Sequence, residues 1–265
     1  MDFKKKYGSW ALIAGGSEGI GAEFARQLAA KGMNLVLLAR DEPILEETAR
    51  VLVKEFSVVV RTVSLDLAED NLMDKLQSVT QDAEIGLLVY NAANPLIGDF
   101  LAQSWENHQH LLKVNVLVPC LLVHHFGQMM QKRAKGGIIL LSSMAGRQGT
   151  AKVAHYAASK AYNLIFAEGL WAELSAWGID VLAVCPGTTR TPGWERSQAN
   201  LKGLIMPPIQ EPKAVVQEAL RALGRKPSII PGFWNRLSAF FLNTFLSRKQ
   251  AIQIISRNTR RMFEK

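Results

Sequence analysis

The start of the chain carries an apolar run, a glycine-rich loop and a helical pattern in direct succession, and this order constrains the fold most. Residues 9–14 are apolar, residues 22–31 place apolar side chains at helical spacing, and glycines occupy positions 15, 19 and 21 between them. A strand, a glycine loop and a helix in this order present backbone N–H groups and a helix N-terminus to a phosphate. The spacing G-x-x-x-G-x-G differs from the commonest dinucleotide fingerprint, so a tight strand–helix turn without a ligand is the alternative.

Strand and helix patterns continue to alternate along the chain. Apolar runs predict strands at 34–39, 58–63, 86–90, 138–141 and 179–184, and helical patterns lie at 42–55, 69–81, 101–112, 116–132 and 154–174. A length of 265 residues suits one large α/β domain. We therefore predict a doubly wound parallel sheet with helices on both faces over residues 1–232, and a basic amphipathic helical extension of the same domain over residues 233–265.

Composition narrows the setting in which this fold works. Two cysteines, Cys120 and Cys185, give neither a disulfide framework nor metal-ligand spacing, which favours a reducing, cytoplasmic compartment. The five histidines show no zinc-ligand spacing, so no metal is expected. No run of about 18 apolar residues is present, and the apolar run after the basic N-terminus is too short for a signal peptide, so no membrane-spanning helix is expected.

Positive charge is concentrated at the C-terminal end. Residues 213–265 hold eleven Lys or Arg and two acids, a charge of +9, whereas the whole chain has +8 and the remainder therefore −1. The segment 233–246 adds aromatic side chains at helical spacing. Such a segment can lie on a membrane surface, cover a substrate site, meet a second copy, or attract an acyl-CoA or acyl-carrier partner, and a solvated helical face is the plain alternative. Nucleic acid is not expected, because no recognised binding motif accompanies the charge.

Two polar residues follow predicted strands where a dinucleotide would bring its adenosine. Arg40 ends the strand 34–39, and in a dinucleotide-binding fold an Arg there accommodates a 2′-phosphate, which favours NADP(H) over NAD(H). The adjacent Asp41 opposes this interpretation, and a solvated Arg is the alternative. Asp66 follows the strand 58–63 and is expected either to cap the next helix or to hydrogen-bond an adenine amino group.

Tyr156 and Lys160 lie four residues apart in the predicted helix 154–174 and therefore share one face. A neighbouring cation lowers the pKa of a Tyr from about 10, which makes the phenol useful in proton transfer near neutral pH. Such a pair alone is common on surface helices. Ser143, thirteen residues earlier, and Asn115, a polar residue between two apolar helical patterns, give the pair further polar neighbours.

Together these motifs resemble the short-chain dehydrogenase/reductase superfamily over roughly residues 8–192. The motifs in chain order are Gly15-xxx-Gly19-Ile20-Gly21, Asp66, Asn91-Ala92, then Asn115, Ser143, Tyr156 and Lys160, and finally Pro186-Gly187. The resemblance implies a Rossmann-like sheet, a nicotinamide cofactor and interconversion of a carbonyl and an alcohol by hydride transfer.

The resemblance also implies a role for each matching residue. Tyr156 would give the proton to the carbonyl, Lys160 would lower the pKa of Tyr156 and bind the nicotinamide ribose, and Ser143 would donate a hydrogen bond to the substrate oxygen. Asn115 would hold a water that links Lys160 to solvent, and Ser142 remains an alternative to Ser143. The implied cofactor contacts are Gly15, Ser17, Gly19, Ile20 and Gly21 at the pyrophosphate, Arg40, Asp66 and Leu67 at the adenosine, Asn91 at the ribose, and Pro186, Gly187, Thr189 and Thr191 at the nicotinamide.

Two positions depart from the family pattern. Ala14 replaces a Thr that braces the glycine loop, and the usual Asn-Asn-Ala-Gly is Tyr90-Asn91-Ala92-Ala93, which affects loop packing more than chemistry. The apolar segment 188–212 predicts a hydrophobic substrate, such as a 3-oxoacyl thioester or a steroid-like ketone. The predicted function is an NADP(H)-dependent oxidoreductase that forms a homo-oligomer, a dimer or tetramer. The alternative is a catalytically silent NADP-binding scaffold or sensor.

Overall fold

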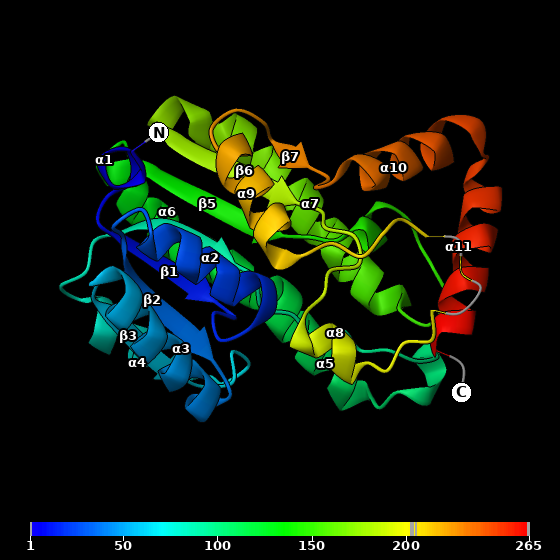
Figure 1. Ribbon diagram of the computed structural model, residues 1–265, viewed down its shortest axis with the longest axis horizontal. Coiled ribbons are helices and arrows are strands. Elements are labelled where there is room, and N and C mark those ends of the chain that lie inside the picture. Colours follow the sequence, from blue (N-terminus) through cyan, green and yellow to red (C-terminus); the bar gives the residue numbers. More distant parts are fainter. Residues whose placement is uncertain (1, 202–203, 205, 264–265) are drawn as a thin grey trace.

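A seven-stranded parallel sheet forms the centre of the computed structural model, which describes residues 2–201, 204 and 206–263 (Figure 1). The strands are β1 (Trp10–Ala14), β2 (Asn34–Ala39), β3 (Val60–Ser64), β4 (Ile85–Tyr90), β5 (Gly136–Leu141), β6 (Ile179–Val184) and β7 (Ser228–Ile229). Their spatial order is β3-β2-β1-β4-β5-β6-β7, and every pairing is parallel. The direction of winding reverses between β1 and β4, and in open parallel sheets ligands bind at the carboxyl ends of the strands at such a point.

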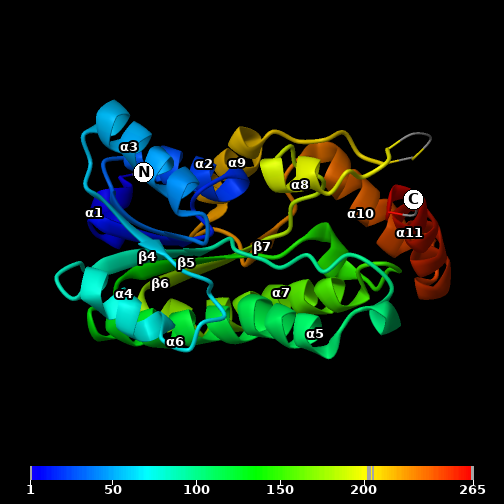
Figure 2. The same cartoon turned by 90° about the horizontal axis from the view of Figure 1, so that it is seen from below.

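Helices cover both faces of the sheet, as the sequence predicted. The longer helices are α1 (Phe3–Tyr7), α2 (Gly19–Ala29), α3 (Glu42–Phe56), α4 (Leu72–Thr80), α5 (Trp105–Leu112), α6 (Val118–Lys132), α7 (Ala154–Leu174), α8 (Pro192–Arg196), α9 (Pro212–Ala222), α10 (Phe233–Phe245) and α11 (Arg248–Phe263). The short helices are η1 (Phe100–Ala102), η2 (Lys113–Leu117), η3 (Met144–Arg147) and η4 (Ser175–Trp177). Figure 2 shows α4, α5, α6 and α7 on one face, and α1, α2, α3 and α9 on the other.

The sheet is apolar on both faces because each strand supplies side chains to two cores. Leu12 of β1 lies in the cluster that faces α6 and α7, whereas its neighbour Ile13 lies in the cluster that faces α2 and α9. Successive side chains of a strand point to opposite faces, so a strand buried on both sides reads as a continuous apolar run. This is why the central strands were recognisable in the sequence.

The segment that joins α5 to α6 differs from the prediction. The sequence suggested a break at Asn115, yet the backbone continues through the π-helical turn η2 without leaving the helix. The wider turn accommodates the inserted residue and directs the side chain of Asn115 to partners outside the helix. A polar residue that would weaken a regular helix is thereby satisfied.

The combined helix Trp105–Lys132 is long and apolar enough to cross a membrane by length and composition, although the sequence predicts no membrane-spanning helix. Within the described ranges it is the one helix of this kind, and half of its apolar window is buried. Leu122 and Phe126 of this helix belong to the core against the sheet. Its apolar character is therefore explained by packing inside the fold.

Candidate active site

Tyr156 and Lys160 lie one turn apart on α7, beside the carboxyl end of β5. Lys160 is 2% exposed, and its Nζ donates a hydrogen bond of 2.7 Å to the carbonyl of Leu141, the last residue of β5. The same Nζ lies 5.8 Å from the centroid of the Tyr156 ring. Burial disfavours the charged amine and lowers the pKa of Lys160 to about 8. The helix therefore holds an easily neutralised amine next to a phenol.

Ser143 is the hydroxyl that joins Tyr156. Burial raises the pKa of Tyr156, and a side-chain hydrogen bond with Ser143 partly opposes this rise. The neighbouring Ser142 is buried and donates a hydrogen bond of 2.6 Å to the carbonyl of Lys160, so its hydroxyl serves the packing of α7. The geometry thus favours Ser143 over Ser142. The pKa of Tyr156 is raised overall in this structure, and a lowering by Lys160 stays a prediction.

Asn115 is fully buried behind the same helix. Its Nδ2 donates to the carbonyl of Asn94 at 2.9 Å and to Oγ of Ser159 at 3.0 Å, and its Oδ1 accepts from the backbone N–H of Asn94 at 2.7 Å. The Ser159 hydroxyl in turn donates to the carbonyl of Tyr156 at 2.7 Å. The side chain therefore ties the loop after β4 to α7. Its predicted water-holding role is still a prediction.

The glycine loop has the shape of a phosphate cradle. Gly15 and Gly19 have positive φ angles of 77° and 60°, where other residues are strained. A Cβ at Gly21 would lie 1.8 Å from the carbonyl oxygen of Gly15, so a side chain there has no room. Helix α2 begins at Gly19 without a side-chain cap, which leaves its first N–H groups for a ligand. These features fit the pyrophosphate of a dinucleotide.

Backbone contacts brace this loop where the family's usual Thr is replaced by Ala14. The carbonyl of Ala14 accepts hydrogen bonds from the N–H groups of Asn91 and Ala92, both at 2.9 Å. The Asn91 side chain donates to the carbonyl of Gly15 at 2.8 Å. Asn91 therefore holds the loop directly, and contact with a ribose remains a prediction.

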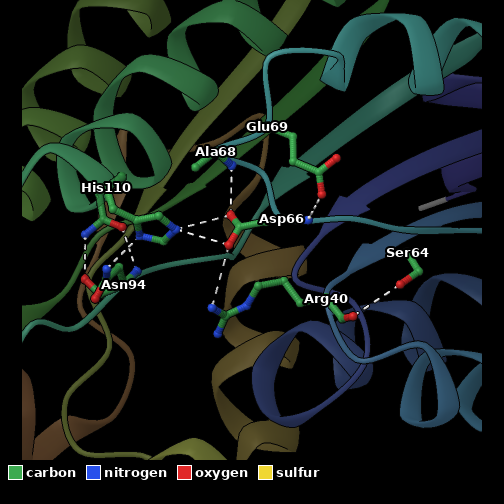
Figure 3. Close-up of polar contacts among 8 residues, drawn as sticks. Arg40, Ser64, Asp66, Ala68, Glu69, Asn94 and His110 are labelled. Atoms are coloured by element: carbon green, nitrogen blue, oxygen red, sulfur yellow. Dashed lines mark hydrogen bonds and ion pairs between the residues drawn. The ribbon is translucent and has the colours of Figure 1, made fainter. Parts of the chain in front are cut away.

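Arg40 and Asp66 meet at the other end of the site (Figure 3). Arg40 Nη1 lies 3.9 Å from Oδ2 of Asp66, and the Arg40 side chain is 73% exposed. Asp66 does not cap α4, which begins at Leu72; its Oδ1 accepts from the N–H of Ala68 at 2.8 Å within a turn. Burial acts to raise the pKa of Asp66, but hydrogen bonds from Ala68 and His110 and the charge of Arg40 outweigh it and lower that pKa. The carboxylate is therefore ionised and oriented. The side chain of the following residue, Leu67, is buried in the core.

The segment after β6 folds back over the glycine loop. The carbonyl of Pro186 accepts from the N–H of Met144 at 3.0 Å, which joins this segment to the Ser143 turn. Thr189 Oγ1 donates to the carbonyl of Gly187 at 3.0 Å, and Thr191 Oγ1 accepts from the N–H of Trp194 at the start of α8. The position that a Cβ on Gly19 would occupy lies 2.9 Å from Cγ2 of Thr191. Thr191 thus lies beside the phosphate cradle, whereas Thr189 is bonded within its own segment.

An ion pair also joins the two segments. Arg196 of α8 forms a two-pronged ion pair with Glu18 of the glycine loop, with 3.0 Å between Nη1 and Oε2. This places the substrate-side segment against the loop that is predicted to hold the pyrophosphate. The sequence did not predict this contact, because the two residues lie 178 positions apart.

The C-terminal helices pack against the loops that flank α7 and follow β6. A Cβ on Gly187 would lie 2.6 Å from Oδ1 of the buried Asn235 on α10. On α11, Oγ of Ser256 accepts from the N–H of Ala151 at 3.1 Å, and Oγ1 of Thr259 lies 2.7 Å from Oγ1 of Thr150. The loop that precedes Tyr156 is therefore held by α11. The polar residues on the inner sides of α10 and α11 had given no signal in the sequence.

No group of three or more metal-ligating side chains lies together in the described parts of the chain. The residues assembled at the site instead serve a nicotinamide dinucleotide well: a glycine cradle, an exposed Arg at the adenosine end, and a phenol, a hydroxyl and an amine at the opposite end.

Comparison with known proteins agrees with this geometry. The family model described as short chain dehydrogenase matches residues 9–202. A 7beta-hydroxysteroid dehydrogenase from Mediterraneibacter gnavus is 31% identical over 243 residues, which cover 90% of this chain and 91% of the relative.

Solved structures are similar over nearly the whole chain. A structure from a study of 7beta-hydroxysteroid dehydrogenase stereoselectivity has a TM-score of 0.90 at 29% identity, covering 96% of this chain and 99% of the other. A short-chain dehydrogenase from Sphingobium yanoikuyae in complex with NADPH has a TM-score of 0.77 at 30% identity, covering 87% and 91%. Because the family match and these relatives extend over most of its length, the chain belongs to the short-chain dehydrogenase/reductase superfamily and is an oxidoreductase of that type.

Proposed function

We propose that the protein is an NADP(H)-dependent oxidoreductase that interconverts a hydrophobic ketone and its secondary alcohol, with Tyr156 as the general acid and base. The observation that carries this proposal is the buried arrangement on α7, where Lys160 is 2% exposed and its Nζ lies 5.8 Å from the centroid of the Tyr156 ring. A protein that only binds a dinucleotide does not need a buried amine beside a phenol. Burying such an amine disfavours its charge and so destabilises the fold.

The proton chemistry follows from the residues present. When bound, the nicotinamide supplies the hydride for reduction or accepts it in oxidation. In reduction, the Tyr156 O–H bond breaks and its proton goes to the carbonyl oxygen, which becomes the alcohol. The Ser143 hydroxyl donates a hydrogen bond to the same oxygen and stabilises the charge that develops on it. The raised pKa of Tyr156 suits this direction, because the phenol stays protonated at neutral pH.

The preference for NADP(H) rests on Arg40. Its guanidinium is exposed at the end of β2, where an adenosine 2′-phosphate would lie in a dinucleotide-binding fold. The Sphingobium yanoikuyae relative, which carries NADPH, supports the same choice.

The proposed substrate is a steroid-like ketone or hydroxysteroid, and a 3-oxoacyl thioester is the second candidate. The similarity to 7beta-hydroxysteroid dehydrogenases across nine-tenths of the chain supports the first class. Trp194, Leu201 and Leu204 of the predicted substrate segment 188–212 are half-buried, and Ile205 of the same segment lies outside the described residues. The cytoplasm is the proposed location, where NADP(H) is available.

Turnover decides between this function and a catalytically silent scaffold. NADPH consumption would be followed with a panel of ketosteroids, 3-oxoacyl thioesters and simple bulky ketones, for the wild type and Tyr156→Phe. We expect the variant to retain NADPH binding and to lose about 10²- to 10⁴-fold in kcat, the usual contribution of a general acid. The proposal is wrong if the wild type binds NADPH but converts nothing faster than Tyr156→Phe does.

We propose that the outer side of α10 contacts a second copy of the chain, which makes the enzyme a homo-oligomer. This helix turns small and polar residues, such as Asn235 and Ala239, toward the fold. Its exposed large side chains are 44% to 64% exposed and are Phe233, Trp234, Leu237, Phe240, Phe241 and Phe245. An apolar stripe of this size on a protein surface marks an interface.

Sedimentation velocity tests the oligomer. Serine at Phe240 and Phe241 should reduce the sedimentation coefficient to that of a monomer, whereas Val51→Ser, at an exposed apolar position on α3, should not. If the wild type is monomeric and floats with anionic phospholipid vesicles, the stripe serves a membrane surface instead. If the protein is retained by an acyl-carrier protein column, the exposed side chains of α10 contact an acyl-carrier partner instead.

A further inference from the structure

His110 lies between Asp66 and Asn94 (Figure 3). It projects from α5, and its Nε2 lies 3.1 Å from Oδ2 and 3.3 Å from Oδ1 of Asp66. Its Nδ1 lies 2.9 Å from Nδ2 of Asn94. Both ring nitrogens are therefore engaged, one by a carboxylate and one by an amide.

The hydrogen-bond partners determine which nitrogen carries the proton. Oδ1 of Asn94 accepts from the N–H of Leu96 at 3.1 Å, so the amide of Asn94 is oriented with its Nδ2 toward the ring. This Nδ2 can only donate, and His110 Nδ1 must accept. The proton of a neutral imidazole then lies on Nε2, which donates it to Asp66. The neutral imidazole of His110 thus donates a hydrogen bond to the Asp66 carboxylate.

The position of Asp66 matters because Arg40 competes for the same carboxylate. Arg40 Nη1 is 3.9 Å from Oδ2, too far for a hydrogen bond, whereas His110 Nε2 is 3.1 Å from it. Without the imidazole, the carboxylate can move to the guanidinium and form a paired, partly neutralised group. An Arg that is already paired with a carboxylate binds a phosphate less well.

We propose that His110 is a positioning residue for cofactor selectivity: it holds Asp66 toward the adenine and away from Arg40, which keeps the guanidinium available to an adenosine 2′-phosphate. The inference rests on the proposed NADP(H) function and assigns a role to a residue outside the family motifs. Through Asn94, whose backbone holds the Asn115 side chain, the same imidazole is linked to the catalytic helix.

The two amide variants of His110 separate its two hydrogen bonds. His110→Gln can place an amide N–H near the position of Nε2 and still donate to Asp66. In His110→Asn the side chain is too short to reach Asp66 and can hydrogen-bond only to Asn94. His124→Gln, at an exposed position on α6, controls for the loss of an imidazole.

Calorimetry with adenosine 2′,5′-bisphosphate and with reduced nicotinamide mononucleotide measures the two ends of the site separately. We expect His110→Asn to weaken binding of the bisphosphate about tenfold, and His110→Gln to stay within about twofold of the wild type. Binding of the mononucleotide should be unchanged in both. In an Asp66→Asn background, His110→Asn should have little further effect, because the carboxylate it orients is gone.

Each other result overturns the inference. Unchanged bisphosphate affinity in His110→Asn removes the positioning role, and equal losses in the Gln and Asn variants, or an equal loss for the mononucleotide, indicate a structural role only. If the wild type binds 5′-AMP as tightly as the bisphosphate, the NADP(H) proposal fails together with the inference. If His110→Asn still prefers the bisphosphate over 5′-AMP by the same factor as the wild type, the inference fails and the NADP(H) proposal stands.

Discussion

The two ends of the cofactor site use charge in different ways. At the end that holds Tyr156, Lys160 is 2% exposed and hydrogen-bonded to a backbone carbonyl, and its pKa is lowered to about 8. At the adenosine end, Arg40 is 73% exposed, and the side chains of Asp66 and His110 are each 32% exposed. Charges interact strongly where water is excluded and weakly where it is present. The buried end can therefore change protonation and reactivity, whereas the exposed end adjusts affinity and selectivity.

The largest expected effect comes from removing the buried charge. Lys160→Met should lower kcat/KM for ketone reduction by about 100-fold or more, a loss in the range of acid–base contributions, because in the proposed mechanism the amine supports Tyr156 and the cofactor ribose. Steady-state rates with NADPH measure it. A variant that retains more than a tenth of the activity would mean that Lys160 does not support the phenol.

Replacing Lys160 should also stabilise the fold. The folded-state pKa of Lys160, about 8, lies below the unfolded value, so its charge destabilises the protein at pH 7. That penalty shrinks as the pH rises from about 8 toward about 10.4, because the folded protein has already released the proton. At pH 7 Lys160→Met should be more stable by up to about 3 kcal/mol, less what the lost hydrogen bond to Leu141 contributed.

Thermal unfolding at several pH values checks this expectation. The melting temperature of Lys160→Met should exceed that of the wild type at pH 7, and the gap should narrow by pH 10. Lys135→Met, directly before β5 and outside the site, gives the effect of losing a Lys elsewhere in the fold. A variant that melts below the wild type at pH 7 contradicts the idea that function here is maintained at the expense of stability.

The sequence was sufficient for most of the fold because the relevant signals are local. β2 and β6 have the bounds that their apolar runs predicted, since strands buried on both faces leave a continuous pattern, and α7 has the bounds that its helical pattern predicted. The π-helical turn at Asn115 was mistaken for a break, because its wider geometry depends on a partner from another loop. Helix α9 was overlooked, although Pro212 at its start and the buried apolar spacing within it are usual signals.

The residues of the site also fall into two groups, those with a local sequence signal and those joined only in the tertiary structure. Tyr156, Lys160 and Ser143 could be found because they recur at fixed spacing in one family. His110 could not, because its contact with Asp66 joins positions 44 residues apart and no spacing rule links them. Arg40 and Asp66 were identified singly from their places after strands, but their competition for one carboxylate depends on the tertiary structure.

At the adenosine end a smaller effect is expected. Arg40→Ala should reduce the preference for NADPH over NADH by about tenfold, since an exposed Arg–phosphate contact contributes a charge-assisted hydrogen bond. The ratio of kcat/KM values for the two cofactors measures it. Arg50→Ala, at an exposed position of α3, should leave the ratio unchanged. An unchanged ratio in Arg40→Ala would show that the adenosine end does not select the cofactor.

The smallest effect is expected at the ion pair that joins the substrate-side segment to the glycine loop. Arg196 is 63% exposed and Glu18 29%, and exposed pairs contribute about 0 to 1 kcal/mol. Arg196→Ala should also leave the Glu18 carboxylate uncompensated near the pyrophosphate. We expect NADPH to dissociate up to about fivefold faster, as measured by stopped-flow fluorescence.

Arg190→Ala is the matched control, because the ion pair of Arg190 is with Glu211 of the same segment and not with Glu18. Salt should narrow the difference between Arg196→Ala and the wild type, since the lost contact is an exposed one. If the Arg196 variant releases NADPH a hundredfold faster, the pair behaves like a buried interaction. The contrast between a buried end that sets reactivity and an exposed end that adjusts affinity would then fail at the loop between them.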